Sequence, residues 1–403
     1  MERREIKLSP PDISEAEINA VVEVLRSGWI TTGPVTKRFE REIAAFCGTQ
    51  RAVCLNSATA ALELTLRILG VGPGDEVITS AYTYTASASI IDHIGARIVL
   101  VDTARDSYEM DYDQLESAIT ERTKAVIPVD IAGVMCDYDR VRSIVEGKSS
   151  LFRPSNQIQE ALGRIAIVAD AAHSIGAVRH GVKSGGAADF TCFSFHAIKN
   201  VTTAEGGAVT WRPISGVSDD DLYRQYMLYS LHGQNKDALA KSKLGGWEID
   251  IQCLGFKFNM TDIAAAIGSE QLKRYPALLE RRKEITELYN EGLRGLPCQP
   301  IQHLGQDFSS SMHLYLVRVD GIDEAARDAI FHRMAQAGIA TVVHYKPLPM
   351  MTAYKNKGFS ISDYPNAFAQ YQNEISLPLH TLLSNDDVSY VISHFKKCLQ
   401  AQG

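Results

Sequence analysis

The sequence has 403 residues, and because a typical domain has about 100 to 200, we expect two or three domains rather than one small binding module. With 45% hydrophobic and 22% charged residues, the composition is that of an ordinary globular protein and not of a disordered chain. The 41 lysines and arginines against 48 acidic residues give a net charge of −7, which offers no basic field to a nucleic-acid backbone. We therefore expect no nucleic-acid partner.

The sequence also lacks patterns for secretion, membrane insertion and metal binding. Residues 1–7 are charged, unlike a secretory signal, and no run approaches the ~20 apolar residues of a membrane span, so we expect no membrane partner. The seven cysteines are odd in number and scattered without a C-x-x-C pair, which favours reduced thiols in a cytoplasmic protein. The eleven histidines show no clustered ligand spacing, so we expect no protein-built metal site.

The first part of the chain predicts helices followed by an α/β unit. Residues 13–47 predict helices, with Ser14 as the start of the first. Short runs that are apolar throughout then follow, as in strands buried on both faces of a parallel sheet: 52–55, 76–78, 97–101, 125–129, 165–168, 190–194 and 207–210. Helical patterns separate them, for example at 60–69, 112–119 and 137–145. This order predicts a three-layer α/β domain whose ligand lies at the carboxyl ends of the strands.

The rest of the chain departs from this alternation. Residues 146–163 are polar and interrupt it, so we interpret them as a surface insertion. Residues 261–293 predict one or two long amphipathic helices, and residues 314–319 begin a strand–helix–strand unit. We therefore expect a large domain at 1–260 that includes the N-terminal helices, and linking helices with a smaller α+β domain at 261–403.

Lys199 and Asp170 are the first candidates for chemistry. Lys199 follows a predicted strand that ends at Ser194, although a lysine in such a place is most often a solvated surface charge. Asp170 stands at the end of another apolar strand, where a carboxylate must either cap a helix or pair with a buried cation. The protonated ring nitrogen of a pyridine is such a cation.

Two further motifs supply what a pyridine cofactor would need. Residues 56–60 form a turn of small residues between a strand and a helix, where free N–H groups and the helix dipole either hold a phosphate or only cap the helix. Tyr82 and Tyr84 follow the next strand and either stack on a flat ring or pack in the core. A phosphate cradle, an aromatic lid, a carboxylate and a lysine able to form a Schiff base together predict pyridoxal 5′-phosphate as the cofactor.

At this point the sequence resembles a known family. Four stretches are similar to those of the DegT-type sugar-nucleotide aminotransferases: SATA at 57–60, DAAH at 170–173, SFHAIKN at 194–200 and GFKFNMTD at 255–262. The likeness runs from Trp29 to His380, nearly the whole chain. It implies the three-layer type I aminotransferase fold, with a mostly parallel seven-stranded sheet and a smaller C-terminal α+β domain.

The resemblance also implies roles for individual residues. As catalytic residues, Lys199 would carry the cofactor as a Schiff base, Asp170 would pair with the pyridine nitrogen, and His173 would lie near the phenolic oxygen. Ala172 and Tyr84 would enclose the ring. The phosphate would be held by Ser57, Ala58, Thr59 and Ser194 of one chain and by Asn259 of a second. The working unit would then be a homodimer with shared active sites.

The same resemblance implies the substrates. Glutamate would give the amine and leave as 2-oxoglutarate, and a UDP- or dTDP-linked keto sugar would receive it, in biosynthesis of amino sugars for a surface polysaccharide or glycan. His173 and the run 194–200 resemble enzymes that aminate C4 of a UDP-linked 4-keto sugar. We favour 4-keto-6-deoxy-HexNAc, because Met350 and Met351 could pack against its C6 methyl group. The diphosphate side of the substrate would meet Trp29, Thr31, Tyr345 and Lys346.

Several alternatives stay open. Within the family, the acceptor could be the 4-keto pentose that yields 4-amino-4-deoxy-L-arabinose, or the amine could go to C3. A sugar 3-dehydratase would carry histidine in place of Lys199, and a regulator without activity would be expected to lose Lys199 or Asp170. A nucleotide-binding dehydrogenase would need a G-x-G-x-x-G motif after the first strand, where residues 56–59 read NSAT instead.

Overall fold

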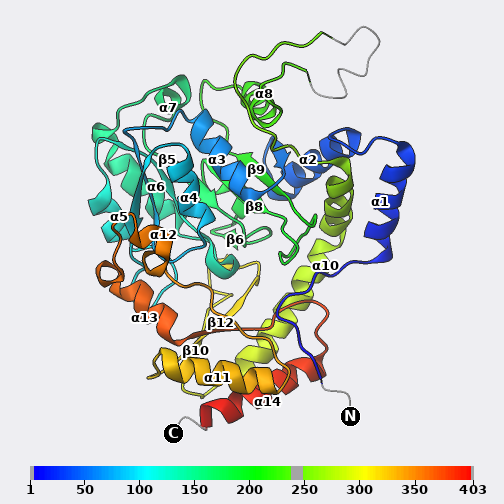
Figure 1. The fold of residues 1–403 in the computed structure, drawn as a ribbon, viewed down its shortest axis with the longest axis vertical. Helices are drawn as coiled ribbons and strands as arrows, with labels where there is room; N and C mark the ends of the chain where they lie inside the picture. The colour runs from blue at the N-terminus through cyan, green and yellow to red at the C-terminus, as the bar shows by residue number, and fades with distance from the viewer. Residues whose placement is uncertain (1–3, 237–247, 401–403) are drawn as a thin grey trace.

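The computed structural model describes residues 4–236 and 248–400 of the protein. A seven-stranded sheet, ordered β1-β9-β8-β5-β4-β2-β3, forms the centre of the larger part of the described chain (Figure 1). Each of its strands overlaps one of the predicted apolar runs. The strands are β1 (Ala52–Leu55), β2 (Glu76–Ser80), β3 (Arg97–Val101), β4 (Thr123–Ile127), β5 (Ala166–Asp170), β8 (Phe190–Ser194) and β9 (Gly207–Trp211).

The sheet is mostly parallel. Strand β2 pairs with β3 and β4, β4 pairs with β5, and β5 pairs with β8, all in parallel. Strand β9 runs antiparallel to both of its neighbours, β1 and β8. Almost all residues of these strands are buried, because helices cover both faces, and this explains why the runs are apolar throughout instead of alternating.

The helices form two layers, one on each face of the sheet. Val53 and Leu55 of β1 pack in one apolar core with α3 (Ala58–Ile68) and α4 (Ala86–His93), and residues of α7 (Gln157–Leu162) and α8 (Asp219–Ser230) join it. Ala52 and Cys54 of the same strand point the other way. They pack with α2 (Pro34–Cys47), α5 (Tyr112–Ala118) and α6 (Tyr138–Gly147). The arrangement is the predicted three-layer α/β architecture.

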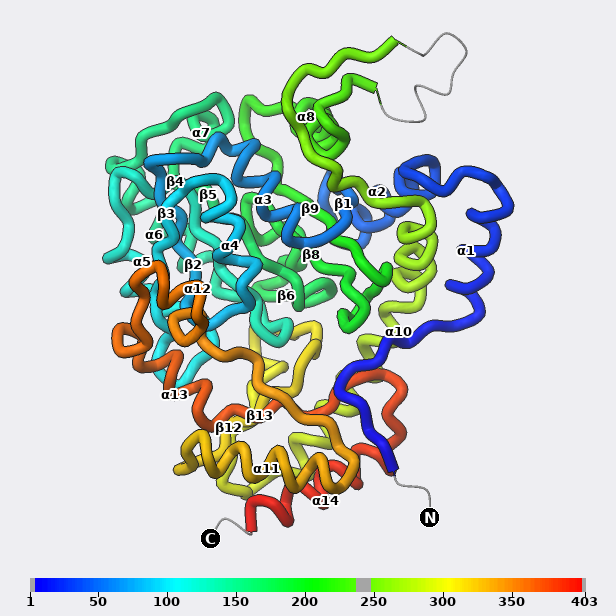
Figure 2. Tube along the Cα trace, in the orientation of Figure 1, coloured from blue at the N-terminus to red at the C-terminus, as the bar shows by residue number. Residues whose placement is uncertain are grey.

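The N-terminal helix α1 (Glu15–Ser27) lies at the edge of the molecule, beside the long helix α10 (Asp262–Gly292) (Figures 1 and 2). Ser14 begins α1 through a capping box with Glu17, as the sequence predicts. The Glu17 carboxylate also accepts a hydrogen bond of 3.0 Å from the Gln271 side chain of α10, which ties the two helices together. Residues 262–292 are one helix and not two, with Pro276 inside it.

A second, smaller sheet of three antiparallel strands lies at the other end of α10, in the order β10-β12-β13. Its strands are β10 (Cys298–Pro300), β12 (Tyr315–Val319) and β13 (Glu374–Leu377). Helices α11 (Glu324–Gln336) and α14 (Asn385–Gln400) share its apolar core. A third sheet joins the two parts of the chain, because a strand from residues 308–309 pairs with strands near residue 180. Its order is β11 (Phe308–Ser309), β6 (Val178–Arg179) and β7 (Val182–Lys183).

The domain division after residue 260 stays a prediction. Segments after this residue pack against both the large and the small sheet. Helix α10 contributes Tyr275 to a core of the large sheet and Ile285 and Tyr289 to the core of the small sheet. Helices α12 (Thr352–Lys355) and α13 (Pro365–Asn373) contribute Tyr354 and Ala367 to the large core. The N-terminal segment crosses in the opposite direction, since Ile6 pairs with Ile339 (Figure 2).

Most of residues 146–163 lie at the surface, as interpreted, but the segment is also anchored to the large core. Phe152 and Ile158 are buried, and Ile158 belongs to α7. The Asn156 and Gln159 side chains donate hydrogen bonds of 3.0 and 2.6 Å to backbone carbonyls at the end of α3. A few scattered apolar residues in a polar stretch are too weak a pattern to predict this packing. Among all the helices that the structure describes, none is both long and apolar enough to cross a membrane.

Candidate active site

A cavity of about 560 Å³ opens at the carboxyl ends of the central strands. This is where a parallel α/β sheet places its ligand, because the loops and helix N-termini meet there. Ten of the fourteen site residues predicted from the sequence line this one cavity. They are Ser57, Ala58, Thr59, Tyr84, Asp170, Ala172, His173, Ser194, Lys199 and Tyr345.

Lys199 lies in a tight turn after β8, in which its backbone N–H donates a hydrogen bond of 2.9 Å to the His196 carbonyl. Its ammonium group makes no hydrogen bond or ion pair with any residue of the described chain. Burial lowers the pKa of the Lys199 amine from 10.5 to about 8, and the nearby negative charge of Asp170 offsets part of this effect. The turn therefore presents a lysine that loses its proton far more readily than a surface lysine.

Asp170 ends strand β5 with its carboxylate buried beside the same cavity. One oxygen accepts a hydrogen bond of 2.6 Å from the Ser87 hydroxyl, and the other accepts one of 3.2 Å from the Ala172 N–H. Burial raises the pKa of Asp170, while these two hydrogen bonds and the charge of Lys199 oppose the rise. The carboxylate has no ion-pair partner in the described chain, so a cationic ring nitrogen would complete its environment.

Ser87 is a site residue that the sequence did not indicate. It is fully buried in the first turn of α4, and its hydroxyl also lies 2.8 Å from the Thr83 hydroxyl. Serine is common near helix starts, so nothing in its neighbourhood in the sequence distinguishes it. Only the packing of α4 against the end of β5 brings its hydroxyl to Asp170.

The turn between β1 and α3 has the geometry of an anion site. Ser57 caps α3, and its hydroxyl accepts a hydrogen bond of 3.1 Å from the Ala60 N–H. The Ala58 and Thr59 N–H groups make no hydrogen bond within the described chain, and both residues line the cavity. Strand β9 packs directly behind, since a Cβ on Gly207 would come within 2.4 Å of the Ala58 nitrogen. Helix dipole and free N–H groups suit a phosphate here.

His173 is held by contacts on three sides. Its Nδ1 accepts a hydrogen bond of 3.2 Å from the Ala132 N–H, so a neutral ring carries its proton on Nε2, which lies 3.2 Å from the Tyr345 hydroxyl. The His313 ring packs on the ring of His173 with centroids 4.4 Å apart. Burial and the nearby Lys199 charge hold the pKa of His173 well below its ordinary value, so the ring is uncharged.

The two predicted aromatic residues, Tyr82 and Tyr84, lie in different environments. Tyr84 lies at the cavity rim with 61% of its surface exposed, and its ring centroid is 6.0 Å from that of Tyr345. Tyr82 is fully buried in the core, and its hydroxyl donates a hydrogen bond of 2.9 Å to the His344 carbonyl. Of the two alternatives for this pair, Tyr82 therefore takes core packing and only Tyr84 lies at the cavity.

Four predicted residues do not line this cavity. The Asn259 amide donates a hydrogen bond of 2.6 Å to the Thr32 hydroxyl, and the Trp29 indole donates one of 3.2 Å to the Thr32 carbonyl. Asn259 and Trp29 thus meet at Thr32, and the backbone of Asn259 pairs with Leu55, which places this segment next to the β1–α3 turn. The other two are Thr31 and Lys346, and the Lys346 side chain is exposed.

The cavity wall also includes residues that the sequence did not indicate. Asp130 and His344 have unusual environments. The buried Asp130 carboxylate accepts hydrogen bonds from the Tyr138 and Ser174 hydroxyls, and burial raises its pKa to about 7. Asp130 stands in no pattern that marks it, because its environment depends on contacts between elements far apart in the sequence. His344 begins the stretch 344–348, which also holds the predicted residues Tyr345 and Lys346.

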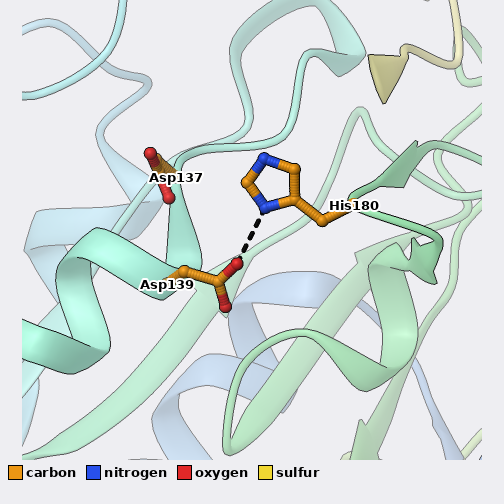
Figure 3. A group of neighbouring side chains, drawn as sticks. All are labelled: Asp137, Asp139 and His180. Atoms are coloured by element: carbon orange, nitrogen blue, oxygen red, sulfur yellow. Dashed lines mark hydrogen bonds and ion pairs between the residues drawn. The ribbon is translucent and has the colours of Figure 1, made fainter. Parts of the chain in front are cut away.

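One group of side chains away from the cavity has ligand atoms close enough to share a metal ion: Asp137, Asp139 and His180 (Figure 3). Each of them already has a partner. The His180 Nδ1 lies 2.7 Å from Asp139, and Asp137 caps α6 and lies 3.7 Å from the guanidinium of Arg179. The positive charge of Arg179 competes with a cation, so the group is better described as an ion-pair cluster.

Comparison with known proteins identifies the family. The sequence profile of the DegT/DnrJ/EryC1/StrS aminotransferase family matches residues 11–396. The spore coat polysaccharide biosynthesis protein SpsC of Bacillus subtilis is 36% identical over 390 residues, which cover 95% of this chain and 94% of SpsC. These matches confirm the resemblance seen in the sequence.

Solved structures agree with this assignment. Spr1654 of Streptococcus pneumoniae, assigned as a sugar aminotransferase, superposes in its PMP form with a TM-score of 0.96 at 54% identity, covering 98% of this chain and 100% of that one. Its PLP form gives the same TM-score at 52% identity, over 99% of each chain. Helicobacter pylori PseC, an aminotransferase involved in the biosynthesis of pseudoaminic acid, gives 0.86 at 29% identity, over 99% and 100%.

A buried lysine, an unpaired buried carboxylate and a helix N-terminus around one cavity fit the cofactor that this family uses. The fold class, the enzyme class and pyridoxal 5′-phosphate are therefore confirmed. The chain belongs to the DegT/DnrJ/EryC1/StrS aminotransferase family, and it is an aminotransferase of the type I fold that uses pyridoxal 5′-phosphate.

Proposed function

We propose that this enzyme moves an amino group from glutamate to C4 of a nucleotide-linked 4-keto sugar, with UDP-linked 4-keto-6-deoxy-HexNAc as the favoured acceptor. The reaction would serve the making of amino sugars for a surface polysaccharide or glycan. The observation that carries the proposal is that Lys199, Asp170 and the anion site of α3 all face one cavity. The sugar is supported by what Spr1654, SpsC and PseC are named for.

In this proposal the cofactor is held at three points. The N–H groups at the start of α3 and the Ser194 hydroxyl bind its phosphate, Asp170 faces its ring nitrogen, and Lys199 is the amine to which it attaches. When bound, the cofactor supplies a ring that accepts electrons and carries the amino group between the two substrates. Asp170 keeps the ring nitrogen protonated, because a buried negative charge favours the charged form of its neighbour.

Lys199 also moves the proton. As a free amine in the cavity it would act as the base, because a pKa of about 8 leaves part of it unprotonated near neutral pH. His173 stays neutral, and its Nε2–H is directed to the Tyr345 hydroxyl. We assign this pair to positioning near the phenolic oxygen of the cofactor, because neither group carries a charge that would compete with Lys199.

We further propose a homodimer in which Asn259 reaches the cofactor phosphate of the partner chain. Three observations support it. Asn259 and Trp29 both hydrogen-bond Thr32, and neither they nor Thr31 line the chain's own cavity. The cavity rim carries Tyr84 and Ile198 with 61% and 40% of their surfaces exposed. Leu254, close in sequence to Asn259, is 93% exposed, which suits an apolar contact with a second copy.

Mixing two inactive variants tests the shared site. An Asn259→Ala chain and a Lys199→Ala chain, unfolded together and refolded, should form heterodimers with one site whose lysine and asparagine are both native. We expect activity to return to at most one site per heterodimer. Each variant refolded alone is the control. No recovery above these controls would show that each site is complete within one chain.

The choice of sugar rests on the relatives more than on the cavity. Met350 packs beside the large core and Met351 is 39% exposed, and neither lines the cavity, so the expected contact with a C6 methyl group has no support within one chain. Trp29, Thr31, Tyr345 and Lys346 remain the proposed contacts for the diphosphate side.

The seven cysteines are all free, which agrees with a reaction in the cytoplasm.

Product analysis decides between the acceptors. The purified enzyme is incubated with glutamate and a panel of UDP- and dTDP-linked keto sugars, and the products are identified by mass and by nuclear magnetic resonance. We expect amination at C4 of the 6-deoxy-HexNAc derivative together with formation of 2-oxoglutarate. A preference for the 4-keto pentose would overturn the substrate, and an amine on C3 would overturn the regiochemistry. Lys199→Ala is the inactive control.

A further inference from the structure

Glu374 is a buried carboxylate behind the cavity wall, and the mechanism described so far does not use it. It begins strand β13, and none of its surface is exposed. No residue of the described chain forms an ion pair with it. A buried carboxylate without a cation is costly, so its hydrogen bonds must account for its presence.

The hydrogen bonds of Glu374 lead to the cavity. Ser376 lies on the same face of β13, two residues away, and its hydroxyl is 2.7 Å from Oε1 of Glu374. The Ser376 hydroxyl is in turn 2.8 Å from Nδ1 of His344, a cavity residue. Oε2 of Glu374 accepts a hydrogen bond of 2.9 Å from the His344 N–H. The Tyr82 hydroxyl binds the His344 carbonyl from the other side, so this histidine is fixed in place.

The row of hydrogen bonds from Glu374 through Ser376 to His344 allows two arrangements of protons. The His344 N–H can only donate, so Oε2 must accept, and any proton on the Glu374 carboxyl group must be on Oε1. When Glu374 is ionised, Ser376 donates to it, Nδ1 of His344 donates to Ser376, and Nε2 is left with a lone pair. When Glu374 is neutral, it donates to Ser376, Ser376 donates to Nδ1, and Nε2 carries the proton.

We propose that Glu374 and Ser376 are positioning residues that decide whether Nε2 of His344 donates or accepts a hydrogen bond at the cavity wall. Going from the neutral to the ionised arrangement, Nε2 loses one proton, Nδ1 gains the Ser376 proton, and Ser376 gains the Glu374 proton. The three groups together lose one proton, and no other bond changes. Nε2 makes no hydrogen bond within the described chain, so it is available to a ligand. Only its use toward a sugar oxygen rests on the proposed function.

The surroundings place this change near neutral pH. Burial raises the pKa of Glu374 to about 8, while the hydrogen bonds from Ser376 and His344 and the charge of Arg327 oppose the rise. Arg327 itself pairs with Asp328. Burial, together with the charge of Lys199, lowers the pKa of His344 to about 4, so the ring stays neutral in both arrangements.

The other charged and titratable groups around Glu374 do not compete for its proton. Arg318, its neighbour across β12, binds Asp106 and Gln299 instead. The Tyr82 and Tyr108 hydroxyls keep their protons, since burial raises the pKa of both well above the ordinary value. The proton that leaves near neutral pH is therefore the one shared by Glu374, Ser376 and His344.

The tautomer of His344 can be measured directly, whatever the substrate is. Holoenzyme labelled with ¹⁵N-histidine is studied by nuclear magnetic resonance, in which protonated and bare imidazole nitrogens resonate far apart, and a His344→Asn spectrum identifies the signals. We expect the proton on Nε2 at about pH 6.5, where roughly 95% of Glu374 is neutral, and on Nδ1 at about pH 9.5, where roughly 95% is ionised. The same tautomer at both pH values would overturn the proposal.

Variants separate the relay from a merely structural role. In Glu374→Gln, the amide oxygen must accept the His344 N–H, so the amide nitrogen donates to Ser376 and Nε2 should keep its proton at both pH values. Ser376→Ala should likewise uncouple the His344 tautomer from pH. Glu40→Gln, at a buried carboxylate that hydrogen-bonds Tyr223 and Cys54 and not His344, is the matched control and should behave as the native enzyme does. A Glu374→Gln enzyme whose tautomer still changes with pH would refute the relay, and if this variant fails to fold, the native titration and Ser376→Ala decide.

Discussion

The reactivity of Lys199 gives the most direct test of the site, because its amine is buried without a partner and lies near one negative charge. With a pKa of about 8, about one amine in ten is unprotonated at pH 7, whereas an ordinary lysine with a pKa of 10.5 has about one in 3,000. The Asp170 carboxylate raises the pKa of Lys199. Asp170→Asn removes this charge and keeps the shape, so it should lower the pKa further and leave more free amine at pH 7.

The assay uses cofactor-free protein, in which the pKa of Lys199 is that of the free amine. Pyridoxal without its phosphate is allowed to react, the product is reduced with cyanoborohydride, and the modified Lys199 peptide is quantified by mass spectrometry from about pH 5 to pH 10. We expect a midpoint near pH 8 for the native protein and a lower one for Asp170→Asn, with exposed lysines in the same digest as internal standards. A midpoint at the value of the exposed lysines, or an upward shift in Asp170→Asn, would refute the electrostatic account of the site.

Three further predictions concern stability and binding. The Asp262 carboxylate accepts hydrogen bonds of 2.8 and 2.9 Å from the Gly33 and Thr36 N–H groups at the start of α2. Asp262→Ala should therefore lower the free energy of unfolding, measured with urea, by about 2 to 4 kcal/mol. An unchanged denaturation midpoint would contradict this. Tyr345→Phe removes the hydroxyl 3.2 Å from His173 and should reduce kcat/KM by about 3- to 10-fold. The free energy of unfolding should change by less than about 1 kcal/mol. A larger loss of stability would point to a structural role instead. Because the folded state holds the Glu374 proton up to about pH 8 and the unfolded state releases it near pH 4.5, the native enzyme should lose stability relative to Glu374→Gln as the pH rises through this window, by at most about 5 kcal/mol. A difference between the two proteins that does not change with pH would contradict the raised pKa.

Much of the large domain could be predicted because its strands are buried on both faces. Each strand then reads as a short apolar run, and Arg97–Val101 and Phe190–Ser194 were predicted with their observed bounds. The same burial makes polar residues at strand ends conspicuous, which is how Asp170 and the Lys199 turn were found. The cavity residues contributed by strand ends and by the β1–α3 turn were therefore within reach of the sequence.

The residues that sequence reasoning missed act through contacts between distant segments. Ser87 reaches Asp170 across 83 positions, and His344 reaches Glu374 across 30. A single polar side chain belongs to no periodic pattern, so its partners depend on how the helices and the small sheet pack on the large one. The same is true of Phe152 and Ile158, whose burial depends on the end of α3. Asn259 is the opposite case, because only the resemblance suggested a role for it.

Sheet topology explains why the two groups of the chemistry meet. Strands β5 and β8 are parallel neighbours with Asp170 opposite Cys192, so the end of β5 and the turn after β8 lie at the same edge, and this brings a carboxylate near Lys199. Strand β9 returns antiparallel beside β8 and also pairs with β1, so the β1–α3 turn is held against Gly207. A larger side chain at Gly207 would displace the N–H groups of α3 from the cavity wall. The place of β9 between β1 and β8 therefore sets the distance between the anion site and the lysine, because it keeps the ends of these two strands two strand spacings apart.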